Sequence, residues 1–233
     1  MKTLTIKLTA PLQSYGNEAT FTRRTTNDYP TKSAVIGMAA AALGYRRTDD
    51  RIVALNDLNF AVRIDQIGRS LTDFQTGEWK KDTRKITYRD YIQDAVFVVA
   101  LGSDDDALIE RIDVALHHPH FQLFLGRRAN VPAGVLVTQQ FSDATPVAAL
   151  KKLPWQATKR YQNRNKGKQL EIIADASLIS DKQSAMVKDR VVSFDQRDRR
   201  YGFRAIARTT VNLTNLNSRE SEPETTQDPF GAL

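Results

Sequence analysis

The chain has 233 residues, 41% of them hydrophobic and none of them cysteine. It can bury a substantial core, but it has no disulfides, thiolate metal ligands or cysteine nucleophile. Its formal charge of +7 favours an acidic partner, nucleic acid before a membrane. Because no apolar run approaches 18 residues and no signal-peptide pattern precedes the alternating stretch TLTIKLTA, we expect a cytoplasmic protein without a membrane partner.

The first elements are a strand, a helix and a second strand. Leu4, Ile6 and Leu8 alternate with polar residues, which predicts a strand that stops before Pro11. The stretch AVIGMAAAALG is apolar nearly all round and predicts a buried helix, capped by Thr31 or Ser33 and stopped at Gly44. Residues 58–66, LNFAVRIDQ, alternate again and predict the second strand.

A third strand, a second helix and a fourth strand follow. DAVFVVAL (94–101) is continuously apolar, as in a central strand. SDDDALIERIDVAL predicts an amphipathic helix that begins with Ser103 as its cap and aspartates in the first turn. FQLFL (121–125) predicts the fourth strand.

This order of elements predicts an α+β protein with a modified ferredoxin-like domain, the arrangement that RNA-recognition domains share. We expect that domain to span 1–148 and a small, mainly β region to span 149–216. From Lys151 to Arg208 the chain has 15 Lys or Arg against 6 Asp or Glu, so this region is basic. Residues 217–233 are polar and acidic, and we expect a disordered tail.

A long insert separates the second and third strands. Residues 67–93 are polar, basic and aromatic, whereas a hairpin connection needs only about 2–5 residues. Long loops inside compact domains are usually functional or disordered, and the interleaved aromatic residues argue against disorder. Gly68 and Gly77 are the candidate hinges or turns within the insert, with a turn around Gly77 the stronger of the two.

The aromatic stacking platform of an ordinary RNA-recognition domain is missing, because the first strand exposes Thr and Lys. RNA would therefore be held by loops and by the insert. Three basic clusters fall at such places, although each alone could be a solvated face. They are Arg23 and Arg24 with Lys32 and Ser33; Lys80, Lys81, Arg84, Lys85 and Arg89; and the loop Gly126, Arg127 and Arg128.

The three histidines, His117, His118 and His120, do not make a convincing metal site, because Pro119 disrupts helical spacing and no carboxylate or cysteine cluster accompanies them. No glycine-rich phosphate loop is present. We expect no metal and no cofactor.

Several blocks of the sequence resemble a known family. LTAPLQSYG, YPTKSAVIGMAAAALG, FAVRIDQ, TYRDYIQDAVFVVAL and FLGRRANVP occur in this order between residues 3 and 132. In that order they resemble the CasD-type subunits of type I-E CRISPR Cascade complexes, members of the RAMP superfamily.

The resemblance implies that the insert is a thumb hairpin and that the protein caps the 5′ handle of crRNA in antiviral defence. It implies contacts with a CasC-type backbone subunit and a CasA-type large subunit, with target DNA nearby. The candidate RNA-binding residues, from the resemblance and the basic clusters together, are Gln13, Tyr15, Arg23, Arg24, Lys32, Ser33, Arg84, Arg89, Arg127 and Arg128.

The same resemblance implies a protein that is not an enzyme, because type I-E systems leave RNA cutting to CasE. The alternative is a metal-independent endoribonuclease that processes CRISPR repeat RNA with His120 or Lys32 and Tyr15. A third possibility is a generic basic RNA chaperone.

Overall fold

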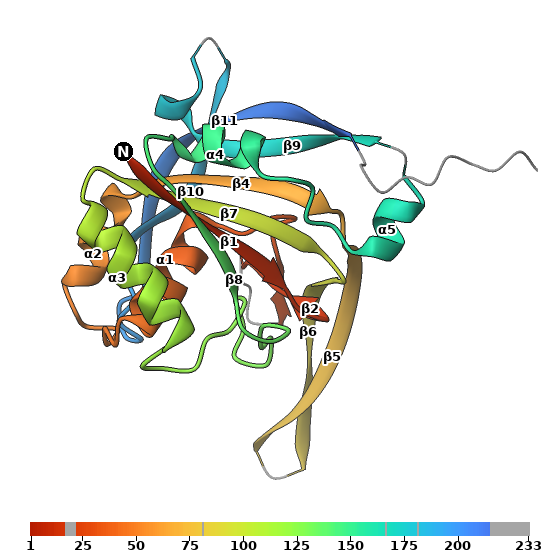
Figure 1. Ribbon diagram of the computed structural model, residues 1–233. Helices are drawn as coiled ribbons and strands as arrows, with labels where there is room; N and C mark the ends of the chain where they lie inside the picture. The colour runs from red at the N-terminus through yellow and green to blue at the C-terminus, as the bar shows by residue number, and fades with distance from the viewer. Residues whose placement is uncertain (17–21, 81, 166, 181, 215–233) are drawn as a thin grey trace, which may run out of the picture.

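The computed structural model describes residues 1–16, 22–80, 82–165, 167–180 and 182–214 (Figure 1). It is a mixed α+β protein built on mostly antiparallel sheets, as the sequence predicts. In chain order the elements are β1 (Lys2–Thr9), β2 (Leu12–Gln13), β3 (Arg23–Arg24), α1 (Lys32–Ala42), α2 (Arg51–Ala54), η1 (Leu55–Asp57), β4 (Asn59–Gln66), β5 (Arg69–Lys80), β6 (Thr83–Gln93), β7 (Val96–Ser103), α3 (Asp106–His117), β8 (Val137–Phe141), α4 (Pro146–Lys152), α5 (Lys159–Asn163), β9 (Gly167–Asp175), η2 (Ala176–Leu178), β10 (Ser184–Ser193) and β11 (Arg200–Thr214).

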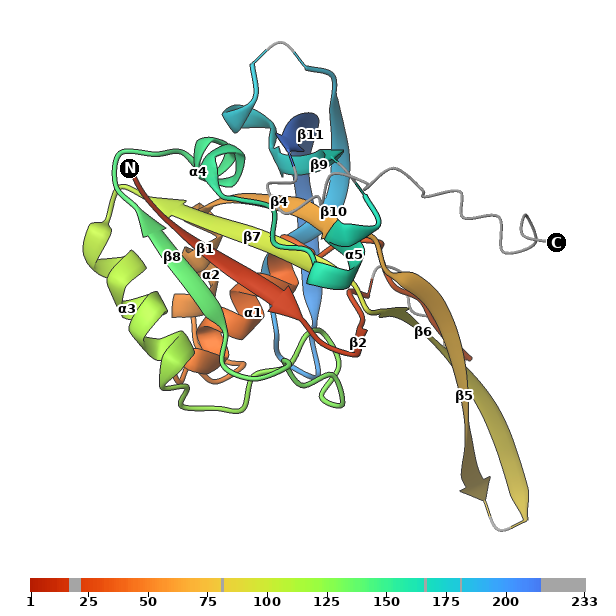
Figure 2. The same ribbon diagram turned by 45° about the vertical axis from the view of Figure 1, so that its right-hand side comes forward.

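The main sheet has seven strands in the order β10-β11-β9-β4-β7-β1-β8. Helices α1 and α3 cover one face and α4 covers the other (Figures 1 and 2). Strand β7 is continuously apolar because it is buried on both faces: Phe97 and Leu101 pack in the core with α1 and α3, and Val98 and Ala100 pack with α4.

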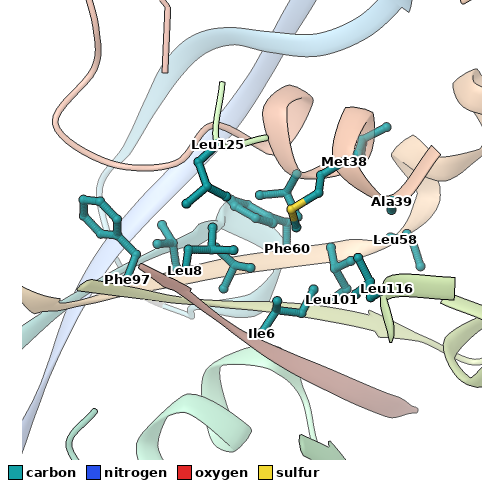
Figure 3. Packing of buried hydrophobic residues seen from close by; sticks show 14 of the residues in the cluster. Ile6, Leu8, Met38, Ala39, Leu58, Phe60, Phe97, Leu101, Leu116 and Leu125 are labelled. Carbon is teal, nitrogen blue, oxygen red and sulfur yellow. The ribbon is translucent and has the colours of Figure 1, made fainter. Parts of the chain in front are cut away.

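The larger core lies between α1 and the sheet. Figure 3 shows Ile6 and Leu8 of β1 together with Phe60 of β4, below Met38 and Ala39 of α1. Helix α1 begins after Thr31, whose hydroxyl accepts a hydrogen bond from the Ala34 amide. The expected helix and its cap are therefore confirmed. In α3 the cap is Asp105 rather than the expected Ser103.

The expected strand at 121–125 is wrong, because this segment is an irregular connection. Its leucines are buried as the apolar pattern requires, but its backbone bonds elsewhere: the Phe121 amide donates to the Ala41 carbonyl at 3.2 Å, and the Leu125 carbonyl accepts from the Ser14 amide at 3.2 Å. Strand β8, sixteen residues after Phe121, occupies the edge of β1 instead.

The insert forms a hairpin of β5 and β6, which projects beyond the body of the protein (Figure 1). Its turn joins Lys80 to Thr83, so the expected turn around Gly77 is wrong. Gly77 pairs with Lys85 inside the ladder. Lys81 lies outside the described residues.

The C-terminal strands continue the main sheet, since β9 pairs with β4 and β11 pairs with β9. Residues 217–233, the expected acidic tail, lie outside the described part of the chain. None of the helices that the structure describes could span a membrane.

Candidate nucleic-acid interface

Strand β6 organises the root of the hairpin. One of its edges pairs with β5, and the other pairs with β2 and β3, which places Arg23 beside Tyr88 and Arg24 beside Arg89. Two of the three basic clusters found in the sequence, the β3 arginines and the base of the insert, therefore meet here.

The glycine loop joins them because Gly126 packs directly against the chain near β2. Gly126 has a φ of 91°, and a Cβ at this position would lie 1.5 Å from the Ser14 carbonyl oxygen. Only glycine has both the conformation and the small volume required. Asn130 is buried and closes the loop by donating from Nδ2 to the Leu125 carbonyl.

Arg127 fixes this loop to the hairpin root. Its Nη1 donates to the Asp90 carbonyl at 2.9 Å, its Nη2 donates to the Arg24 carbonyl at 2.8 Å, and its guanidinium lies 4.5 Å from the centre of the Tyr91 ring. The rigid fork of donors is used to join two chain segments. Arg127 is therefore chiefly a structural residue, with part of its charge still at the surface.

We call Arg23, Arg24, Arg89, Arg127 and Arg128 the arginine cluster. Arg23 and Arg128 are exposed, and Arg23 pairs with Asp90 at 3.2 Å. Hydrogen bonds from Thr72 and Arg23 lower the pKa of Asp90, so this carboxylate stays ionised.

Three members of the cluster keep their charge available. Across the described ranges, no carboxylate pairs with Arg24, Arg89 or Arg128. The Nε of Arg89 is buried and has no hydrogen-bond partner in the part of the chain that the structure describes. Arg24 and Arg128, which are exposed, present their guanidinium groups to the solvent.

Gln13 and Tyr15 lie inside the protein rather than at this surface. Gln13 donates from Nε2 to the Ala95 carbonyl at 2.8 Å and accepts from the Tyr15 hydroxyl at 2.7 Å. Burial raises the pKa of Tyr15 above its usual range, and its ring packs edge-on against Phe97. Both side chains support the turn on which the glycine loop rests.

Lys32 also lies inside, in a network that joins α1 to the C-terminal strands. Its Nζ donates to Asp175 at 3.2 Å and its amide donates to Asp189 at 2.9 Å, and Arg204 bonds to both carboxylates. Burial lowers the pKa of Lys32, and Asp175 opposes that shift. Ser33, half-buried, lies with its Oγ 3.2 Å from the Thr31 hydroxyl. Neither residue joins the arginine cluster.

The hairpin beyond its root has an exposed apolar face that the sequence analysis did not assign to a site. Phe74 is 64% exposed and lies opposite Tyr88, 46% exposed, with Ile86 next along the strand. Arg84 is exposed near the tip, opposite Glu78. Period-2 alternation within the insert is the signal that places Phe74, Tyr88 and Ile86 on one face.

The histidines are separated by the fold. His117 sits at the end of α3 near Asp113, whereas His120 lies against Gly44 and Phe121. In the ranges that the structure describes, no group of three or more His, Cys, Asp or Glu could hold a metal ion.

A mixed sheet protein with five arginines at the root of a projecting hairpin, three of them without a carboxylate partner among the described residues, has the features of a polyanion-binding protein. Comparison with known proteins gives the family. The sequence pattern of the family described as CRISPR-associated protein (Cas_Cas5) matches residues 3–206, and the chain belongs to that family.

Individual proteins are also similar to this chain. The chain is 31% identical over 147 residues to the CRISPR system Cascade subunit CasD of Escherichia coli K12, a match that spans 54% of this chain and 65% of that protein. A chain from a solved CRISPR RNA-guided surveillance complex is 30% identical, with a TM-score of 0.74 and 91% of each chain covered. A crystal structure of a Cas protein is 30% identical, with a TM-score of 0.65, and covers 95% of this chain and 100% of that one.

Proposed function

We propose that this chain is a non-catalytic, RNA-binding subunit of a type I-E CRISPR Cascade surveillance complex, and that its arginine cluster holds the 5′ handle of crRNA. The observation that carries the proposal is that Arg24, Arg89 and Arg128 have no carboxylate partner among the described residues, while Arg24 and Arg128 are exposed at the hairpin root. Guanidinium forks match phosphate geometry. The CasD name of the E. coli relative and the surveillance complex that contains the similar chain support the cellular setting.

The proposal includes a ferredoxin-like domain at 1–148. Strands β4, β7, β1 and β8 lie in the order 2-3-1-4 of that fold when they are numbered along the chain. The hairpin enters between the second and third of them, where a thumb would belong. We assign residues 149–216 to a basic C-terminal region.

The partners follow from the exposed surfaces. The apolar face of the hairpin, with Phe74, Tyr88 and Ile86, fits a contact with a CasC-type backbone subunit. A CasA-type large subunit and target DNA complete the proposed surroundings, and the assembly is cytoplasmic.

The endoribonuclease alternative has less support. Tyr15 is 2% exposed with its hydroxyl bonded to Gln13, and Lys32 is 5% exposed and bonded to Asp175. His120 lies at the far end of α1 from Lys32, so these groups do not converge on one reacting atom.

Anisotropy titration of a labelled handle RNA against salt tests the proposal. Each phosphate contact with a single strand contributes about 0.7 to the salt slope. The double variant Arg24→Gln/Arg128→Gln should flatten the slope by about 1.4. The matched control is Arg46→Gln/Arg47→Gln, which removes two exposed arginines between α1 and α2 and should leave the slope unchanged. Equal salt slopes in the two variants would contradict an RNA site at the arginine cluster. Site-specific cleavage of repeat RNA by the purified protein would favour the endoribonuclease alternative.

A further inference from the structure

A second basic surface lies at the hairpin root, on helix α5. Lys159, Arg160 and Arg164 are all exposed, and we call them the basic helix face. Arg160 lies within α5 and Arg164 is its C-cap residue, whose backbone is still αR, so the two follow one another on one side of the helix end. No carboxylate pairs with any of the three within the described chain.

The helix that presents these cations is held firmly from behind. Thr158 caps it by accepting from the Tyr161 amide, Tyr161 packs edge-on against Trp155, and Gln162 donates to the Trp155 and Ala157 carbonyls. A five-residue helix is unstable in isolation, so these buried contacts define its position. The three cations are thus presented from a fixed platform.

Gln66 sets the position of this platform relative to the hairpin. Its Oε1 accepts from the amide and the hydroxyl of Thr158, at 3.2 and 2.9 Å, and its Nε2 donates to the Asp94 carbonyl at 2.7 Å. Gln66 ends β4, three positions before the hairpin begins at Arg69, and Asp94 directly follows the hairpin's last residue, Gln93. One buried amide therefore joins α5 to both ends of the hairpin, and Figure 2 shows α5 beside the start of β5.

The hairpin root separates this surface from the arginine cluster. The cluster is built on the edge of β6 that pairs with β2 and β3. The basic helix face adjoins the opposite side, where β4 leads into β5. A single strand that follows the arginine cluster would have to cross the hairpin to reach α5.

We propose that the basic helix face binds the phosphate backbone of a second nucleic-acid strand, distinct from the RNA held by the arginine cluster and kept apart from it by the hairpin. The inference rests on the proposed function for the first strand. The recognition is through charge alone, because three cations on a short helix offer no donor and acceptor pattern that could read bases. Either DNA or a further stretch of RNA could supply such a backbone, so the test must distinguish them.

The expected effect follows from counterion release. Each phosphate contact strengthens binding by about 4- to 5-fold at about 150 mM salt, so three contacts amount to a factor on the order of 50 to 150. The salt slope should fall by about 2 to 3 when all three cations are removed.

The full-length protein is first saturated with unlabelled handle RNA and then titrated with a labelled short DNA duplex, a DNA single strand or an RNA single strand of unrelated sequence. The test variant is Lys159→Gln/Arg160→Gln/Arg164→Gln. The matched control is Arg46→Gln/Arg47→Gln/Lys188→Gln, with the same change in charge at exposed positions away from the hairpin root. Thermal unfolding checks that both variants remain folded.

We expect the test variant to weaken binding of at least one labelled probe by the stated factor, while the control variant and the affinity for handle RNA stay close to wild type. The probe that is lost identifies the strand as DNA or RNA. Equal affinities in the test and control variants would overturn the proposal, as would complete displacement of every probe by handle RNA. An unchanged affinity of Arg24→Gln/Arg128→Gln for handle RNA would instead contradict the RNA site at the arginine cluster. Failure of that proposal is therefore distinguishable from failure of the proposal for the basic helix face.

Discussion

Arg127 and Arg128 are adjacent in the sequence, yet we expect their replacement to have opposite consequences. Arg127 donates to two backbone carbonyls and lies over Tyr91, whereas Arg128 is exposed and without a carboxylate partner in the described residues. Charge-assisted hydrogen bonds contribute about 1.5–3 kcal/mol each and a surface cation–π contact about 0.5–1 kcal/mol. Because Arg127 is half-exposed we take the lower values, and Arg127→Gln should cost about 3.5 kcal/mol.

For a domain of this size such a loss of stability corresponds to a fall in Tm of roughly 7–14 °C. Arg128→Gln should change stability by less than about 0.5 kcal/mol, while it flattens the salt slope of RNA binding by about 0.7. Arg127→Lys provides the control, since it keeps the charge but cannot bridge two carbonyls. It should be nearly as unstable as Arg127→Gln.

Urea unfolding followed by tryptophan fluorescence measures the stabilities, and anisotropy measures the slopes. If Arg127→Gln unfolds like the wild type, the two carbonyl contacts do not fix the loop and the reasoning fails. Equal losses of stability in Arg127→Gln and Arg128→Gln would refute the division of roles.

Further predictions concern the supports of the site. Gly126→Ala should destabilise the protein by about 2–4 kcal/mol, because its Cβ must displace backbone, and a change of less than about 0.5 kcal/mol in urea unfolding would contradict this. Tyr15→Phe should destabilise the protein by about 1–3 kcal/mol, because it leaves the buried Oε1 of Gln13 without its donor, and should leave the affinity for handle RNA unchanged. Loss of RNA binding in a variant that remains folded would show that Tyr15 contacts the RNA. Burial lowers the pKa of Lys32, so between that lowered pKa and the ordinary value of 10.5 the unfolded chain binds more protons than the folded one. The free energy of unfolding should therefore rise with pH across this window, and Lys32→Met should flatten the rise. Identical stability–pH profiles for Lys32→Met and the wild type would refute this prediction. Replacing residues 76–86 by a Gly-Ser turn should leave Tm unchanged, since the ladder pairs of Thr76, Gly77, Glu78 and Lys80 are all made within this range. It should weaken incorporation into the guide complex on size exclusion, and normal incorporation would show that the hairpin has no part in assembly.

Local patterns in the sequence predicted β1, α1, β4, β7 and α3, but not β8, α4 and the C-terminal elements from α5 to β11. The apolar residues of β1, β4, β7 and α1 all lie in the core, as residue type predicts. The alternation in β1 and β4 is misleading about the other face, because Thr3, Thr5, Arg63 and Asp65 are buried too. The length and aromatic residues of the insert argued against disorder, and the family resemblance implied a hairpin, whose turn lies between Lys80 and Thr83, beyond Gly77.

Backbone partners were not predictable in the same way. Residues 121–125 have the apolar alternation of a strand and are buried accordingly, but the free edge of β1 is filled by β8. Two segments competed for one edge, and the outcome depends on the path of the whole chain after α3. A periodic pattern records burial and does not record which strand donates the hydrogen bonds.

The residues of the candidate site were likewise only partly predictable from the sequence. The sequence by itself determined that the protein is basic and that arginines follow Gly126 and precede α1. Only the tertiary structure decided which of these cations face outward. Gln13, Tyr15 and Lys32 lie within about ten residues of Arg23 and Arg24 in the sequence, but their side chains are buried. Internal hydrogen bonds offset the cost of removing their polar groups from water. Arg24, Arg89 and Arg128 come together because β3, β6 and the glycine loop meet at one edge, so their common position follows from long-range pairing that no local pattern contains.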